Sequence, residues 1–93
     1  MISIVAKFVI KEGEEENFMR LVNTLGDASR AEEGCAAYVL HKSINKPLTY
    51  CLLEKWKHQA AIDFHNQTAH FTSIVPEIVK IASAEIDVYQ PVE

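Results

Sequence analysis

Hydrophobic and polar positions change their period along the chain, and each change marks an expected element of secondary structure. Residues 2–11 alternate, and the apolar side chains that would share one face are Ile2, Ile4, Ala6, Phe8 and Ile10. A two-residue period predicts a β-strand, which Gly13 would end. Apolar residues then recur every three or four positions, at Phe18, Leu21, Val22, Leu25 and Ala28. That spacing predicts an amphipathic helix, with glutamates in its first turn and Glu33-Gly34 at its end.

The remaining patterns predict two strands, two helical segments and a last strand. In chain order these segments are 36–43, 48–56, 58–66, 70–82 and 84–90. The turn signal Asn45-Lys46-Pro47 joins the first two as an antiparallel hairpin. Pro76 lies inside the second helical stripe, where a proline is expected to kink or split the helix.

The predicted order, βαββαβ, is typical of the ferredoxin-like α+β fold, in which a four-stranded antiparallel sheet carries its helices on one face. The 93 residues are short enough for a single domain spanning 1–93.

Two of the predicted strands are apolar on both faces, although the helices can cover only one. On the first strand, Val5 and Val9 lie on the face opposite the core face. On the third strand, Cys51 and Leu53 lie on that same outer face. An antiparallel sheet with one wet face should alternate apolar and polar residues cleanly. We therefore expect a homodimer packed sheet to sheet, with a monomer that exposes an apolar sheet as the alternative.

Composition narrows the class of protein. The net charge is −4 and the 9 lysines and arginines are scattered, which argues against a nucleic-acid or membrane-surface partner. No apolar run approaches the ~18 residues of a membrane span and no signal-peptide pattern is present, so a cytoplasmic domain is expected. In that compartment, Cys35 and Cys51 are expected to be thiols rather than a disulfide.

Residues that could carry chemistry gather in one third of the chain: Glu54, Trp56, His65 and His70. Glu54 either pairs with a cation at the sheet end or has a pKa raised by an apolar setting, as a base or as the orienter of a histidine. Trp56 fits the core, where its indole N–H needs a partner. His65 lies on the apolar helix face and is either a core histidine or a catalyst.

A metal site is not favoured by the histidine spacing. His65 and His70 are five positions apart, about 140° around a regular helix, so they meet only if the chain breaks between them. With Glu54 they would then form a two-histidine, one-carboxylate site. No dinucleotide fingerprint or phosphate-binding loop is present either. We therefore expect no metal and no cofactor.

Several short motifs resemble the antibiotic biosynthesis monooxygenase (ABM) family. They are Glu32-Glu33-Gly34-Cys35-x-x-Tyr38, Glu54-x-Trp56, Ala61-Ile62-x-x-His65 and Thr68-Ala69-His70-Phe71. The resemblance implies a dimeric α+β barrel. It also implies an activity from a set that includes cofactor-independent oxygenation of polyphenols, quinol oxidation, haem degradation and isomerisation of a phosphorylated signal. Trp56 stands where the isomerase pattern has Tyr, and Ala6 and Lys7 stand where haem-degrading members have Asn.

The oxygenase and isomerase activities share one requirement: a base that removes a proton from a substrate conjugated with a carbonyl. The expected roles are His65 as base, Glu54 as its orienter, His70 or Tyr50 as oxyanion donor, and Trp56, Phe64 and Phe71 as walls. A small-molecule monooxygenase acting on a quinol or polyphenol is the preferred hypothesis. The alternatives are an isomerase or tautomerase of a small carbonyl compound and a non-catalytic ligand-binding dimer.

Overall fold

The computed structural model describes all 93 residues and has the predicted order of elements. In chain order they are β1 (Ile2–Ile10), α1 (Glu15–Arg30), β2 (Cys35–Lys42), β3 (Thr49–Trp56), α2 (Gln59–Asn66), α3 (Ala69–Ile81) and β4 (Ala82–Tyr89). Most observed and predicted boundaries differ by no more than two residues, which is the usual uncertainty at the ends of elements. The exception is α1, which ends at Arg30 and not at Glu33-Gly34.

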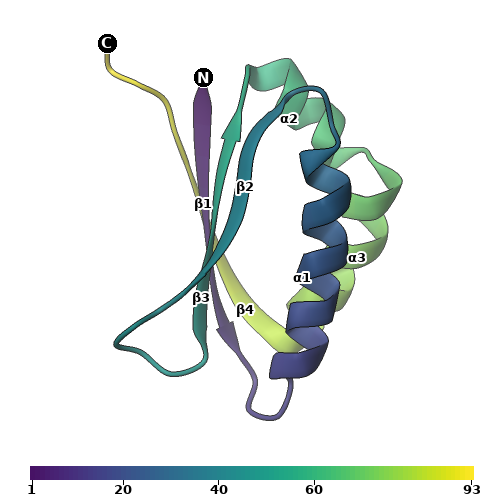
Figure 1. Cartoon of the computed structure of the whole chain (residues 1–93), viewed down its shortest axis with the longest axis vertical. Helices are drawn as coiled ribbons and strands as arrows, with labels where there is room; N and C mark the ends of the chain where they lie inside the picture. Colours follow the sequence, from purple (N-terminus) through teal and green to yellow (C-terminus); the bar gives the residue numbers. More distant parts are fainter.

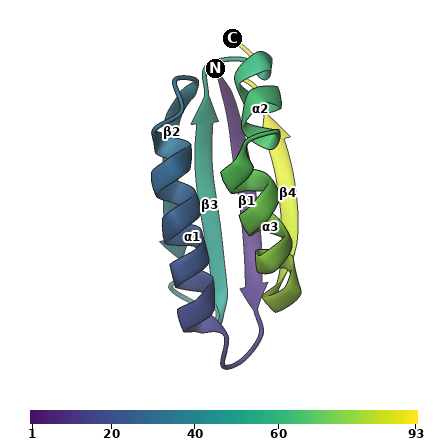
Figure 2. The same ribbon diagram turned by 90° about the vertical axis from the view of Figure 1, so that its right-hand side faces the viewer.

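The four strands form one antiparallel sheet in the order β2-β3-β1-β4. All three helices lie on the same face, so the molecule has a sheet layer and a helix layer (Figure 1). Seen from the helix side, α1 lies over β2 and β3, whereas α2 and α3 lie over β1 and β4 (Figure 2). The ferredoxin-like prediction is therefore confirmed for the protomer.

The core lies between these two layers. It consists mainly of apolar residues that the two-residue strand alternation and the three-to-four-residue helix spacing place on the inward faces. Its largest fully buried hydrophobic side chains are Trp56, Phe18, Ile10 and Ile78. Phe18 packs edge-on against Phe8, with ring centroids 5.3 Å apart. Burying a large apolar side chain of this kind contributes roughly 1.5–3 kcal/mol, so the contacts between the sheet and the helices stabilise the fold.

The other face of the sheet carries no element of this chain. Val9, Val39 and Leu53 point out from it and are 52%, 49% and 41% exposed. The β2–β3 loop and the C-terminal tail both project on that side of the sheet (Figure 1). The chain therefore presents an apolar sheet face framed by two projecting segments.

The predicted split at Pro76 is wrong. Helix α3 runs through Pro76 without interruption, because the proline removes only one N–H and the carbonyl left unpaired, four residues back on Thr72, belongs to an exposed residue. The break lies earlier, between α2 and α3, where the Thr68 hydroxyl accepts a hydrogen bond from the Phe71 N–H and caps α3.

One smaller expectation is also confirmed. Cys35 and Cys51 are both free, partly buried thiols, as expected. None of the helices combines the length and the apolar character that a membrane crossing requires.

Candidate active site

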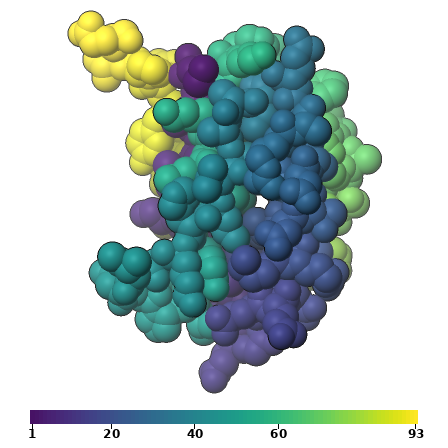
Figure 3. All heavy atoms as spheres, in the orientation of Figure 1, coloured from purple at the N-terminus to yellow at the C-terminus, as the bar shows by residue number.

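A cavity of about 260 Å³ lies between the sheet and the helices, and 14 of its 17 lining residues are hydrophobic. Its polar lining residues are Glu54, His65 and Asn66. Val79 on α3 and Ile86 and Val88 on β4 line it and are still 55–60% exposed, so the mouth lies between α3 and the edge strand. On the opposite edge, where α1 and β2 face the viewer, a small opening between the sheet and the helices is visible in the space-filling view (Figure 3). We call the cavity of about 260 Å³ the inner cavity.

His65 is buried against the inner cavity within a cage of aromatic rings. Its ring lies on that of Trp56, with centroids 4.3 Å apart, and meets the edge of Phe71 at 5.1 Å. Nδ1 lies 2.7 Å from Oε2 of Glu32. Because a carboxylate only accepts, Nδ1 carries the proton and Nε2, which has no hydrogen bond within the chain, is left as the basic nitrogen. Burial lowers the pKa of His65, and the contact with Glu32 partly offsets that effect.

Glu54 is the second ionisable group on the cavity wall. Its Oε1 accepts a hydrogen bond of 3.0 Å from the indole N–H of Trp56. Burial raises the pKa of Glu54 from 4.5 to about 7, with the Trp56 hydrogen bond opposing the shift. The raised pKa expected from an apolar setting is therefore present, and Glu54 can exchange a proton near neutral pH.

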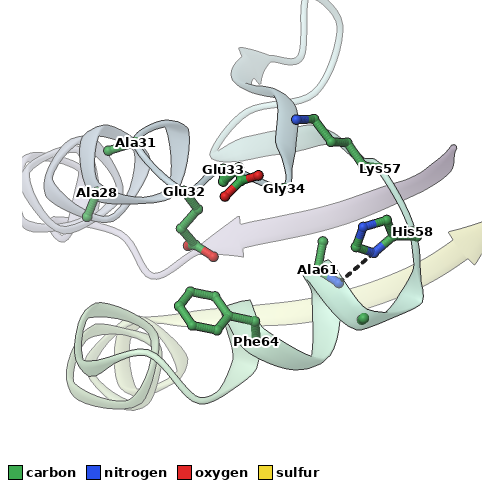
Figure 4. A pocket seen from close by; sticks show the side chains of 10 residues that line it. Ala28, Ala31, Glu32, Glu33, Gly34, Lys57, His58, Ala61 and Phe64 are labelled. Atoms are coloured by element: carbon green, nitrogen blue, oxygen red, sulfur yellow. Dashed lines mark hydrogen bonds between the residues drawn. The ribbon is translucent and has the colours of Figure 1, made fainter.

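Glu32 reaches His65 because of the sheet topology. In an antiparallel hairpin the start of β2 lies beside the end of β3, so the residues before Cys35 meet the helix that follows Trp56. Gly34 permits the approach, since a Cβ there would overlap the side chain of Ala61 on α2. The carboxyl group of Glu32 points toward α2 and lines a second, outer pocket of about 550 Å³ beside Phe64 (Figure 4).

Sequence reasoning missed Glu32, although a signal was present. The Glu32-Glu33-Gly34 segment was interpreted only as the end of a helix and as part of a family motif. The predicted hairpin already implied that an acid before its first strand lies beside the helix after its second strand. That helix carries His65.

Comparison with known proteins gives the same family as the motifs. The antibiotic biosynthesis monooxygenase family matches residues 1–77. The chain is 41% identical over 88 residues to the Bacillus subtilis (strain 168) protein named "Putative monooxygenase YcnE", covering 95% of this chain and 93% of that one. The chain belongs to the antibiotic biosynthesis monooxygenase family.

Solved structures agree with this assignment to the ABM family. A conserved protein from Methanosarcina mazei Go1 superimposes with a TM-score of 0.92 at 31% identity, over 96% of this chain and 90% of that one. An antibiotic biosynthesis monooxygenase structure gives the same TM-score at 28% identity, with both chains fully covered. These superpositions show that the chain has the ABM fold, and they do not identify a substrate.

The structure brings only some of the seven predicted site residues together. Glu54, His65 and Phe71 line the inner cavity together. Trp56 is fully buried behind that wall, where it supports both the His65 ring and the Glu54 carboxyl group, so it is not a wall itself. His70 does not line the inner cavity, because its Nε2 is directed at Glu32, 2.7 Å away.

The last two predicted substrate contacts lie elsewhere. Tyr50 is at the opposite end of β3 from Trp56 and packs against Phe18, with ring centroids 5.4 Å apart. Phe64 is 65% exposed and faces the outer pocket. The expectation that Glu54 orients His65 is also wrong, because Glu54 bonds to Trp56 and the partner of His65 is Glu32. Tyr50 was misplaced because a strand face shows which residues point inward but not how far along the strand the cavity extends. Phe64 was misplaced because it lies on the exposed side of α2 and not on the side that faces the sheet.

Proposed function

We propose that the chain is a cofactor-independent monooxygenase that oxidises a quinol or a similar enolisable aromatic compound in the inner cavity. The observation that carries the proposal is a buried histidine with one nitrogen held by a carboxylate and the other free, on the wall of an apolar cavity. A cavity of about 260 Å³ equals the liquid volume of about nine water molecules, which suits a small ring compound.

The charge of the lining favours a neutral substrate over a phosphorylated one. No lysine or arginine lines the inner cavity. Lys7 and Lys42 line one more open pocket and Lys55 lines another, and none of the three lines the inner cavity. A phosphate group buried without a cation would lose its hydration without compensation. The lining therefore supports an aromatic alcohol rather than the phosphorylated substrate of an isomerase.

The proposed reaction starts with transfer of a phenolic proton to Nε2 of His65. The resulting phenolate gives one electron to O₂, and the two radicals combine into a peroxide on a ring carbon. Loss of water from the peroxide leaves a hydroxyquinone, so one oxygen atom enters the product and the other enters water. The quinol supplies the electrons, and the imidazolium of His65, stabilised by Glu32, returns its proton to the departing hydroxide.

The location of the site can be tested by blocking each cavity in turn. Ala84 lines the inner cavity and Ala60 lines the outer pocket, and both are exposed alanines. We expect Ala84→Trp to lower kcat/KM for a hydroquinone by about tenfold or more, because the indole occupies the space where the ring must sit. Ala60→Trp is the matched control and should leave kcat/KM close to the wild-type value.

The readout is steady-state quinone formation, with circular dichroism to show that both variants are folded. The reverse order of effects would place the substrate in the outer pocket and contradict the proposal. Equal activity of all three proteins would do the same.

We also propose that the uncovered sheet face binds the same face of a second copy. The face is apolar at Val9, Val39 and Leu53. The β2–β3 loop and the C-terminal tail project on the same side of the sheet, where they would contact a second copy (Figure 1). Two such sheets would bury each other's apolar side chains in the way that β-sandwich layers do.

Sedimentation at micromolar concentration should give about twice the protomer mass of 10.5 kDa. Leu53→Asp should shift the protein toward the protomer mass, because it would bury an unpaired charge in the interface. Asn23→Asp adds the same charge on the exposed surface of α1 and should leave the mass unchanged. A wild-type protein that is folded and sediments as a monomer would rule out this interface.

A further inference from the structure

Glu32, His65 and His70 form a compact cluster of potential metal ligands. One ligand atom from each residue lies within 4.8 Å of the others. Oε2 of Glu32 is 2.7 Å from both His65 Nδ1 and His70 Nε2. The chain break that such a cluster requires lies between the end of α2 and the start of α3, and it lets the two histidines face the same carboxylate.

The carboxyl group in this cluster is not fully satisfied. The Glu32 side chain is only 5% exposed, and its Oε1 is buried with no hydrogen-bond partner. Its only ion-pair partners are the two histidines, since no lysine or arginine pairs with it. A buried carboxylate is costly when no lysine or arginine pairs with it and one of its two oxygens has no hydrogen bond, and a divalent ion would supply the missing positive charge.

The cluster is also accessible without passage through the inner cavity. Glu32 lines the outer pocket, which is open to solvent beside Phe64 (Figure 4). The side chain of His70 is 22% exposed. An ion can therefore approach from the outer pocket, and water can occupy a remaining coordination position.

We propose that Glu32, His65 and His70 bind a divalent transition-metal ion, with Zn²⁺ as the representative case. Two imidazoles and one carboxylate are donors that such ions prefer, and three protein ligands with one open position make a common four-coordinate arrangement. Small side-chain movements are enough, because the ion takes the place of the two N–H protons that now point at Oε2 of Glu32.

Metal binding has a consequence for His65 that rests on the proposed function. When an ion occupies Nδ1, the single proton of the neutral ring moves to Nε2. Nε2 then donates and cannot accept a proton from a substrate. The bound ion therefore inhibits the oxygenase and is not its cofactor.

The binding claim is tested on the full-length protein after chelator treatment, by calorimetric titration with Zn²⁺ and by the visible absorption of Co²⁺. We expect one ion per chain and the absorption of a tetrahedral Co²⁺ site. Glu32→Gln and His70→Gln should each weaken Zn²⁺ binding by at least about tenfold, since even the partners of metal ligands are worth that much. His41→Gln, an exposed histidine on β2, is the control and should bind as the wild type does.

Absence of stoichiometric binding, or binding that Glu32→Gln and His70→Gln leave unchanged, would overturn the metal site. Inhibition is a separate arm: Zn²⁺ should abolish quinol turnover, and the chelator should restore it. Binding with full activity would refute the inhibitory role alone. A wild-type protein that binds Zn²⁺ but oxidises no quinol would refute the proposed function and leave the site standing.

Discussion

Replacing His65 with alanine is expected to lower kcat for quinol oxidation by about 10²- to 10⁴-fold, the usual contribution of a positioned general base. The reason is geometric, because Nδ1 is fixed on Glu32 and Nε2 is the only basic ring nitrogen left for a substrate on this wall. Steady-state kinetics gives kcat, and thermal unfolding of the same sample gives Tm.

His65 also contributes to the core, where it is 3% exposed, so the alanine variant is expected to lose some stability as well. His65→Gln separates the two effects. It keeps most of the side-chain volume and an amide donor for Glu32 but has no basic nitrogen, so Tm should recover while kcat stays low. A histidine with only a structural role gives the opposite pattern, in which His65→Ala lowers Tm and leaves kcat nearly unchanged.

Replacing Glu54 with glutamine is expected to stabilise the protein at alkaline pH. In the folded chain the pKa of Glu54 is raised from 4.5 to about 7. Between these two values the unfolded chain holds fewer protons, so the free energy of unfolding falls as the pH rises and then stays low above pH 7. At about 1.4 kcal/mol per pH unit, the cost at pH 8 is about 3 kcal/mol. Glutamine cannot ionise, and its amide oxygen can still accept from Trp56.

The measurement is chemical denaturation at pH 5 and pH 8 at a fixed protein concentration. Glu54→Gln should exceed the wild type by about 1–3 kcal/mol at pH 8 and by much less at pH 5. Glu85→Gln removes an exposed strand carboxylate and serves as the control, with no comparable gain. A difference between Glu54→Gln and the wild type that is the same at both pH values would show that Glu54 is not a strained buried carboxyl group.

The fold could be predicted because the hydrophobic pattern that specifies each helix or strand lies within that element. Alternation in residues 2–11 and helical spacing from Phe18 onward reflect which side of each element is buried, and burial is the main driving force of folding. Pro76 was misjudged because an exposed helix surface tolerates one missing hydrogen bond. The actual break depends on a single capping hydroxyl, that of Thr68.

The site was only partly predictable because it depends on contacts between distant parts of the chain. The hydrophobic patterns placed Glu54 on the inward face of its strand and His65 on the inward face of its helix, and both residues line the cavity. The partner of His65 comes from 33 residues earlier in the chain, a separation that no helix or strand period encodes. Tyr50 has the correct face for a cavity residue but the wrong end of its strand. Position along an element is fixed by register and packing, which require the folded structure.

The most direct test of the oxygenase proposal is the fate of isotope-labelled O₂ during incubation of the chelator-treated protein with a panel of hydroquinones. The proposed reaction predicts a hydroxyquinone that contains one labelled oxygen atom, with no product under nitrogen and none from His65→Gln. A product without label, or an isomerised compound that forms equally well under nitrogen, would contradict it.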